Sequence, residues 1–533
     1  MNPPGTAPAP RSEAAAAAPP TAVPPAAVPP AAQTPAPQPE SRTSDRVPAP
    51  VWVVAAAFAA LELAVSGRYG FQQDELYFIE AGHHLALGYV DQPPLIPLLN
   101  RITTGIFGLN PTAVRIVPAL TGAALVVVAA RFAALFGAGR LGRVLAALVT
   151  ACAPVVIGAS HIGNTTSPEM LAWAVTGLCV TTALLRDRPR WWLGAGVAAG
   201  IGLEDNNLIV LLLALLAIGI AVTKHRPALR TRWPWLGAAI ALALWVPNLI
   251  WQASHGWPQL VMASALHQEN TSTADYIGGP VAQIIYVGLL AAPLVIAGFV
   301  RLWRTPELRF LAVAASLVVI YVLAWIPGRE YYTDGMAPAV IAAGAAAVEG
   351  WVARGRGPRL RRWLAVAAPV LGMAVLLPFT LPIVPATDVH ALPASVQQSS
   401  GVGDEIGWPA LARAIAAQDA ALIRSGHRPT SIFTGYYAEA AALDVLGPAH
   451  RLPPVLSGHN AYWIWGPGQA SDAAVLVVDA LGQLRPYFAS CRRLATYHAP
   501  YGVRNDWTDI GIGICTGPRA SWPALWPHLR HYG

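Results

Sequence analysis

The chain has 533 residues, of which 55% are hydrophobic and only 12% are charged, and its formal net charge is +7. Typical soluble domains carry about 25% charged residues, so this composition excludes an ordinary soluble protein and indicates a membrane protein. The positive charge does not indicate nucleic-acid binding, because the basic residues gather in short loops between apolar segments, where they set the orientation in a membrane.

The first 48 residues form an Ala- and Pro-rich tract with almost no large apolar side chain. Such a tract cannot bury enough apolar surface to offset the entropy lost on ordering, so we expect residues 1–48 to be disordered. The tract lacks the short apolar core and cleavage site of a signal peptide. The first apolar segment, about 51–66, is therefore expected to be an uncleaved anchor.

Apolar segments long enough to cross about 30 Å of hydrocarbon follow as far as residue 384. With the first anchor they predict about eleven spans, and hence a mainly α-helical, polytopic bundle over residues 49–384. Nine of the other segments are 112–136, 143–160, 168–185, 208–223, 233–252, 281–300, 309–326, 333–351 and 362–384. The tenth, 191–203, is short for a span and is counted because a turn at 204–207 separates it from the next segment.

The loops between these segments divide into two sets that differ in charge. If the N-terminus is cytoplasmic, the inner loops hold 17 Lys and Arg, whereas the outer loops hold only Arg68, Arg101 and Arg329. This asymmetry is what the positive-inside rule requires. We therefore expect residues 1–48 to be cytoplasmic and residues 385–533 to be extracytoplasmic.

Asp74 and Glu75 stand side by side just after the first span, on the expected outer side. Carboxylates near a bilayer are costly unless they face water, a cation or a substrate, so the pair indicates a functional site. The alternative is that both acids cap the helix that follows, because acidic side chains suit a first helical turn. These residues alone leave both interpretations open.

The rest of the first outer loop contains two partly apolar stretches with helical spacing, 75–87 and 95–109. They predict two short helices lying in the plane of the membrane interface, where they would hold a lipid headgroup beside Asp74. The alternative is a lid that packs on other loops.

The segment 385–533 alternates short apolar runs with helical stretches, which predicts a small α/β or α+β domain. The expected elements are strands near 431–433, 474–478 and 510–515 and a helix at 408–424. Cys491 and Cys515 fall in this domain, and an oxidising outer compartment makes a disulfide between them plausible. The domain contains no recognisable catalytic constellation, so we interpret it as an acceptor-binding or lid domain.

The outer-loop motifs resemble those of a known family. Asp-Glu after the first span, followed by Gly88-Tyr-Val-Asp-Gln-Pro-Pro-Leu95, is similar to the integral-membrane glycosyltransferases of the protein O-mannosyltransferase and aminoarabinose-transferase superfamily. The similarity covers roughly residues 50–350 and depends on the order and shared outer location of the motifs. Further matching motifs lie at 115–122, 165–169, 247–251, 255–258 and 328–332, and 434–440 and 457–460 resemble the soluble domain of bacterial members.

The resemblance implies a GT-C fold and an enzyme that moves a sugar from a polyprenyl-phosphate donor to an acceptor hydroxyl. It makes Asp74 the candidate for the base that the reaction needs. Glu75 would then either orient Asp74 or help to hold a divalent metal, although no ligand spacing specifies a metal. The second acidic residue of the family, usually an aspartate at the start of the fourth span, is Glu169 here.

One outer turn departs from the family's pattern. Relatives commonly carry a lysine there that approaches the donor phosphate, whereas this chain offers Asn206, an uncharged amide. Arg329 is the expected replacement, although pairing with Glu330 would also explain it. Arg68, Arg101 and Arg115 are the further candidates for this replacement, although snorkelling to the interface is the preferred explanation for Arg68 and Arg101. The residues expected to bind substrates are Arg329, Tyr331, Tyr332, Asn206, Arg115, Tyr89 and Asp91.

Two other functions stay open at the level of the sequence. A secondary transporter would use acids near the midplane and paired broken helices, whereas here the acids gather at one face. A non-catalytic protein that binds lipid-linked sugars is the other alternative, and it stays open because Asn206 stands where relatives carry a lysine. The expected partners are a polyprenyl-phosphate sugar, the lipid bilayer and a protein, glycolipid or polysaccharide acceptor. The Ala-, Arg- and Pro-rich composition favours a bacterial plasma membrane.

Overall fold

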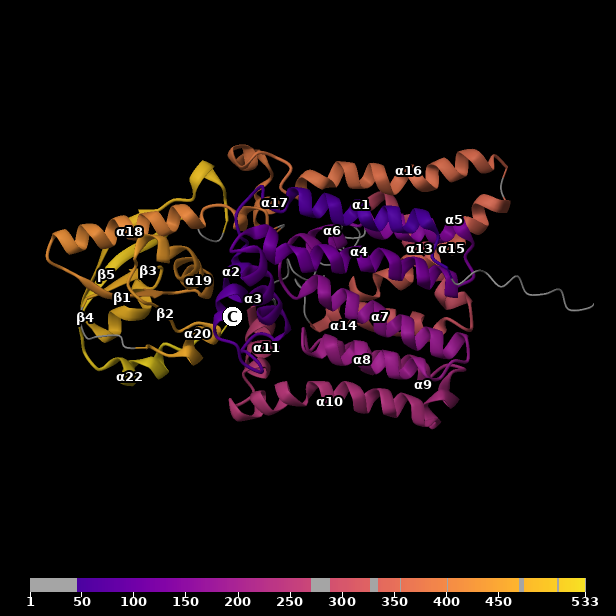
Figure 1. The fold of residues 1–533 in the computed structure, drawn as a ribbon, viewed down its shortest axis with the longest axis horizontal. Helices are drawn as coiled ribbons and strands as arrows, with labels where there is room; N and C mark the ends of the chain where they lie inside the picture. The colour runs from indigo at the N-terminus through magenta and orange to yellow at the C-terminus, as the bar shows by residue number, and fades with distance from the viewer. Residues whose placement is uncertain are drawn as a thin grey trace, which may run out of the picture. The chain divides into compact units, whose positions relative to one another are not determined.

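The computed structural model describes residues 46–269, 288–325, 334–354, 356–399, 401–468, 474–505 and 508–532. Over these ranges the chain is mainly helical and ends in a small sheet, which confirms the predicted fold class (Figure 1). Residues 43–533 form one compact unit. Of the tail predicted at 1–48, only the last three residues lie in the described ranges.

Helices occupy the predicted apolar segments of the bundle (Figure 1). The longer ones are α4 (Pro111–Leu135), α7 (Thr166–Leu185), α10 (Arg232–Ser254), α15 (Ala337–Arg354) and α16 (Pro358–Leu376). The shorter ones are α1 (Ala49–Val65), α5 (Arg140–Ala151), α6 (Pro154–His161), α8 (Trp191–Leu203), α9 (Ile209–Ala221), α13 (Ala292–Arg304) and α14 (Arg309–Trp325).

Several of these helices can cross a membrane. In the described part of the chain, five are long and apolar enough to do so, and the pair α5 and α6, bent by 54°, makes up to six. The bend coincides with Pro154 at the start of α6, because a proline lacks the N–H that would continue α5. α1, α8, α9 and α14 are apolar but have only 17, 13, 13 and 17 residues. The chain is a multi-pass membrane protein, and the count of eleven spans stays a prediction.

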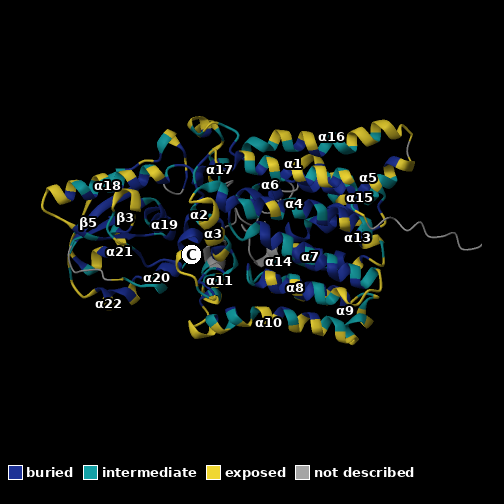
Figure 2. Cartoon of the chain, in the orientation of Figure 1, coloured by how far each residue is buried: buried dark blue, intermediate teal, exposed yellow. Residues whose placement is uncertain are grey.

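Burial differs between the helices of the bundle (Figure 2). α4 lies in the core, where Leu125 and Phe132 are fully buried. α10 and α16 instead expose large apolar side chains such as Ile250 and Val375. Lipid tails are as apolar as these side chains, so both helices are suited to face the hydrocarbon of the bilayer.

The loop after the first span, which the sequence predicts to be an outer loop, forms the two predicted helices, α2 (Gln73–His83) and α3 (Leu95–Phe107). α3 exposes the apolar side chains of Ile102 and Ile106, as expected of a helix in the interface plane. α2 differs from this expectation, because most of its side chains are buried under the C-terminal segment, where it packs against α19 (Tyr437–Leu446). α2 is thus buried beneath the C-terminal segment.

The C-terminal segment folds into a domain with both helices and strands (Figure 1), which we call the outer domain after its predicted location. Its helices besides α19 are α17 (Ala394–Ser399), α18 (Trp408–Arg424), α20 (Asn460–Trp465), α21 (Leu481–Leu484) and α22 (Trp522–Leu525). Its strands are β1 (Pro429–Thr434), β2 (Val455–Ser457), β3 (Ala474–Val478), β4 (Phe488–Tyr497) and β5 (Ile510–Pro518). The predicted helix and the three predicted strands are all present.

The five strands form one mixed sheet in the order β2-β1-β3-β5-β4. β1 is parallel to β2 and β3, whereas β5 is antiparallel to β3 and β4. Ile432 pairs with Leu476, and both belong to the core that contains residues of α18 and α19. The next pair, Phe433 and Val477, belongs to the core on the other face, together with α22. This alternation is what a period of two residues produces in a sheet covered on both sides.

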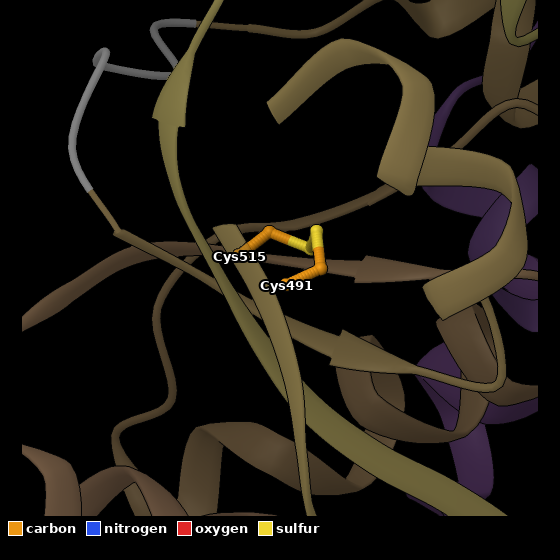
Figure 3. The surroundings of a disulfide bond; sticks show 2 residues. All are labelled: Cys491 and Cys515. Atoms are coloured by element: carbon orange, nitrogen blue, oxygen red, sulfur yellow. A yellow bond between two sulfur atoms is a disulfide. The ribbon is translucent and has the colours of Figure 1, made fainter. Parts of the chain in front are cut away.

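A disulfide joins Cys491 of β4 to Cys515 of β5, as the sequence suggested (Figure 3). The two cysteines are direct partners in the antiparallel register, with their Cα atoms 4.1 Å apart. Disulfides persist in oxidising compartments, so this bond is consistent with a domain outside the cytoplasm.

The carboxyl ends of β1 and β2 point the domain's loops toward α2. β1 leads through Gly435 into α19, and β2 leads into α20. A side chain at Gly435 would bring its Cβ within 2.7 Å of the carbonyl oxygen of Asp479 after β3, so only glycine fits this turn. Crevices at such strand ends are where open α/β sheets commonly bind ligands.

Candidate active site

The start of α2 separates the roles of Asp74 and Glu75. The side chain of Gln72 accepts a hydrogen bond from the Asp74 N–H at 2.6 Å, and the Glu75 carboxylate accepts one from the Gln72 N–H at 2.8 Å. This reciprocal arrangement is a capping box. Glu75 therefore caps the helix, as one interpretation of the sequence proposed, while Asp74 is only half-buried and directs its carboxylate elsewhere.

Glu75 is also one half of a buried ion pair. Arg115 at the start of α4 donates from Nε to Glu75 Oε1 and from Nη2 to Oε2, each at 2.8 Å. The Gly163 N–H donates to Oε1 at 2.8 Å as well. The two side chains are at most 1% exposed. Because both oxygens of Glu75 are occupied by donors, the residue does not fit the role of a metal ligand in this arrangement.

The remaining donors of Arg115 bind other parts of the chain. They reach the carbonyl oxygens of Ser66 and Gly70 at 2.7 and 3.0 Å, and the Glu405 carboxylate and His161 at 3.1 Å each. A guanidinium has five N–H donors, so this arrangement leaves none for a donor phosphate. Arg115 thus connects the C-terminal end of α1 and the start of α4 to the 3-10 turn Gly403–Glu405, which precedes α18 in the outer domain.

The carboxylate of Asp74 faces the outer domain. Its Oδ1 accepts a hydrogen bond of 2.8 Å from the hydroxyl of Tyr437, the first residue of α19. Asp91, in the loop after α2, is close enough for its charge to interact with that of Asp74. The structure therefore brings together two of the predicted site residues, Asp74 and Asp91, beside a tyrosine that the sequence did not place there.

Two tyrosines fix the loop that carries Asp91. Tyr77 on α2 donates to Asp91 Oδ1 at 3.0 Å and accepts a bond from the Ala461 N–H of the outer domain at 3.3 Å. Tyr89 is buried, and its hydroxyl donates to the Ala81 carbonyl oxygen at 2.9 Å. The predicted substrate residue Tyr89 thus holds the loop against the end of α2.

Burial gives Asp91 a pH-dependent contribution to stability, raising its pKa from 3.8 to about 7. Between these values the folded protein holds a proton that the unfolded chain releases, so stability should fall as pH rises from about 4 to about 7. In Asp91→Asn this contribution disappears, and we expect the Tm to change less across the same window. Thermal unfolding of purified protein, with exposed Asp388→Asn as control, measures it; identical pH profiles of wild type and Asp91→Asn would contradict the assignment.

A second acidic group lies between α7 and the turn after α8. Glu169 is buried and its Oε2 accepts a hydrogen bond of 2.9 Å from the Asn206 side-chain amide. Asp205 beside it is fully buried, and neither of its carboxylate oxygens has a hydrogen-bond partner among the described residues. Burial, and then the nearby Glu169, raises the pKa of Asp205 well above its usual range. The uncharged side chain of Asn206 is therefore surrounded by the acidic residues Glu169 and Asp205.

The other predicted residues are dispersed or outside the described ranges. Arg329, Tyr331 and Tyr332 fall in 326–333, which the structure does not describe. Arg68 and Arg101 are exposed, and Arg101 donates to the Gly82 carbonyl oxygen at 3.1 Å. Within the described residues, no group of three or more His, Cys, Asp and Glu side chains is arranged to hold a metal ion.

The sequence missed the residues that join the outer domain to the site. Tyr437 lies 363 positions from Asp74, and Glu405 lies 290 positions from Arg115. The motif at 434–440, which contains Tyr437, resembled the soluble domain of bacterial relatives, but nothing in its local sequence indicates a contact with α2. Sequence spacing reports neighbours on one element, and these contacts are made between elements.

A family comparison agrees with the motifs. Residues 91–251 match the sequence model of the family described as dolichyl-phosphate-mannose-protein mannosyltransferase. The matched range contains Asp91, Glu169 and Asn206 but begins after Asp74. No curated protein sequence matches the chain significantly.

Two solved structures of ArnT show the same fold. ArnT from Cupriavidus metallidurans bound to undecaprenyl phosphate is 18% identical, with a TM-score of 0.54 over 87% of this chain and 98% of that chain. The apo state of ArnT gives a TM-score of 0.52 at 17% identity, over 87% and 97% of the two chains. An oligosaccharyltransferase from Archaeoglobus fulgidus in the apo form is a weaker match, with a TM-score of 0.48 at 13% identity, over 76% and 64%. The family match and the ArnT-like fold confirm the resemblance that the sequence motifs indicated.

Proposed function

We propose that the protein transfers a sugar from a polyprenyl-phosphate donor to an acceptor hydroxyl on the outer side of the membrane, with Asp74 as the base. The observation that carries this proposal is the position of Asp74. It is a half-buried carboxylate at the outer end of the bundle, next to the strand ends of the outer domain. By contrast, Glu75 and Glu169 are buried and already bonded to neighbouring side chains.

In the proposed step the acceptor oxygen attacks the anomeric carbon while its proton passes to Asp74. The bond between the anomeric carbon and the phosphate oxygen breaks, and polyprenyl phosphate leaves. One displacement of this kind inverts the configuration at the anomeric carbon. Glu75 accepts hydrogen bonds from Arg115 and from the Gln72 and Gly163 N–H groups, and it thereby fixes the helix that presents Asp74.

The carrier's apolar tail needs a path along the bundle. A cavity of about 500 Å³ lies between α13, α14 and α15, lined by apolar side chains such as Phe299, Val319 and Val340 and by Asp334. The bound undecaprenyl phosphate of the ArnT structure supports the same class of ligand here. We assign part of the polyprenyl chain to this cavity, with its phosphate at the outer end.

Substitution of Asn206 tests whether the side chain at position 206 contacts the donor phosphate. Asn206→Lys would place an ammonium near the outer turn, where a charge-assisted contact strengthens phosphate binding. We expect tighter donor binding, reduced in part because Glu169 would compete for the new cation. Donor titrations on wild type and Asn206→Lys measure this, with Asn206→Gln as the uncharged control. Equal affinity in all three would show that position 206 does not meet the phosphate.

Labelled polyprenyl-phosphate sugars distinguish the three functions that the sequence left open. Membranes containing the protein should consume such a donor and release the free carrier phosphate. A non-catalytic binding protein would retain the donor unchanged, and a secondary transporter would ignore it. Either of the last two outcomes, over a panel of hexose and pentose donors, would contradict the proposed function.

A further inference from the structure

We propose that Tyr437 of the outer domain is a positioning residue for Asp74, so that the outer domain forms part of the active site. This inference rests on the proposed function, in which Asp74 is the base. It assigns the outer domain a role in the chemical step as well as any role in holding the acceptor.

The contact itself is direct and buried on the Tyr437 side. The Tyr437 hydroxyl donates to Asp74 Oδ1 at 2.8 Å, and the tyrosine is only 9% exposed. A carboxylate has about four acceptor positions, so one donated bond is compatible with the approach of an acceptor hydroxyl. The hydrogen bond fixes one oxygen of the base in place.

The tyrosine ring is held firmly enough to fix that oxygen. Its backbone N–H donates to His459 Nδ1 at 3.2 Å. Its ring packs against those of Tyr77, at 4.8 Å between centroids, and His459, at 5.2 Å. Tyr77 belongs to α2 and His459 follows β2, so the ring of Tyr437 contacts residues on both sides of the interface between α2 and the outer domain.

The bond must run from the hydroxyl to the carboxylate. Burial, and then the charge of Asp74, raises the pKa of Tyr437 well above its usual value of 10. The hydroxyl therefore stays protonated at physiological pH and can donate. A hydrogen bond to the charged form of an acid favours that form, so Tyr437 should keep Asp74 ionised and able to take a proton.

Other groups near this contact also influence whether Asp74 is ionised. Asp91, from the loop after α2, is a like charge that disfavours a second anion when ionised. Glu75, on the same helix, is neutralised by Arg115. Tyr436, the preceding residue in the outer domain, interacts with the side chain of Tyr437. The hydrogen bond from Tyr437 thus opposes the repulsion by Asp91.

The test is the pH at which the Asp74 carboxyl protonates. Infrared difference spectra of the full-length protein against Asp74→Asn identify this carboxyl, and they do not require any enzymatic activity. In Tyr437→Phe we expect the midpoint to rise by about one pH unit, because a hydrogen bond to a charged group shifts a pKa by this order. Incorporation of fluorotyrosine at position 437, a stronger donor of the same shape, should lower the midpoint and so covers the case in which Tyr437→Phe folds poorly.

Tyr462→Phe is the matched control. Its hydroxyl lies at the same interface but donates to Asp444 Oδ2 at 2.8 Å, so its removal should leave the Asp74 midpoint unchanged. An unchanged midpoint in both Tyr437 variants, or an equal shift in Tyr462→Phe, would overturn the inference.

Turnover separates this inference from the proposed function. Tyr437→Phe should lower kcat by about tenfold with little change in donor KM, because the base is misplaced while the donor site is intact. If no polyprenyl-phosphate sugar is transferred but the midpoint shifts, the positioning contact stands and the proposed function fails. If transfer proceeds and the midpoint stays fixed, the positioning role fails alone.

Discussion

Asp74→Asn should lower sugar transfer by about 10²-fold or more while the protein remains inserted and folded. Asparagine keeps the shape of the side chain and can still accept the hydrogen bond from Tyr437, but it cannot take the proton of the acceptor hydroxyl. Turnover of purified protein, normalised to the folded fraction, measures the effect. Asp388→Asn, the same substitution at an exposed position of the outer segment, is the control and should transfer sugar normally.

Glu75→Gln is the informative contrast to Asp74→Asn. It weakens a buried ion pair, so we expect it to reduce the amount of folded protein more than the turnover of each folded molecule. Near-normal transfer by Asp74→Asn, together with a loss of turnover in well-folded Glu75→Gln, would exchange the roles of the two acids.

Arg115→Met should destabilise the protein by about 3–5 kcal/mol, since removing one partner of a buried pair leaves uncompensated charge. Two carboxylates, Glu75 and Glu405, would lose their common partner, and two backbone carbonyls would lose a donor. The measurements are the Tm in detergent and the resistance of the outer domain to protease. Arg101→Met, at an exposed arginine with a single carbonyl contact, should change neither.

A second substitution tests the cause of that loss. In the Arg115→Met background, Glu75→Gln should restore part of the Tm, because it removes one of the stranded charges. A normal Tm in Arg115→Met combined with weaker donor binding would instead support the phosphate-binding role that the sequence suggested for Arg115.

The elements of the fold could be predicted because their signals are local. Apolar length located the bundle helices, and alternating runs located β1, β3 and β5. The helix expected at 408–424 is α18 with the same bounds. The helix α2 was also expected, but its burial was not, because the segment that covers it lies more than 300 residues further along the chain.

The site could be predicted only in part. Asp74 could be singled out because a carboxylate near a bilayer is energetically costly unless it faces water, a cation or a substrate. Arg115 also stood out, yet its partners Ser66, Glu75, His161 and Glu405 come from four separate segments. A sequence shows that an arginine is present but not how many of its donors the fold has already engaged. The same limit hid Tyr437, whose contact with Asp74 exists only once the outer domain has docked on α2.

The most direct measurement uses purified protein and a polyprenyl-phosphate sugar labelled differently on the sugar and on the carrier. The account predicts that free polyprenyl phosphate and the glycosylated acceptor form in equal amounts, with inversion at the anomeric carbon. It also predicts that both products disappear in Asp74→Asn. A donor that stays intact in the presence of wild-type protein, or products that form equally in Asp74→Asn, would contradict it.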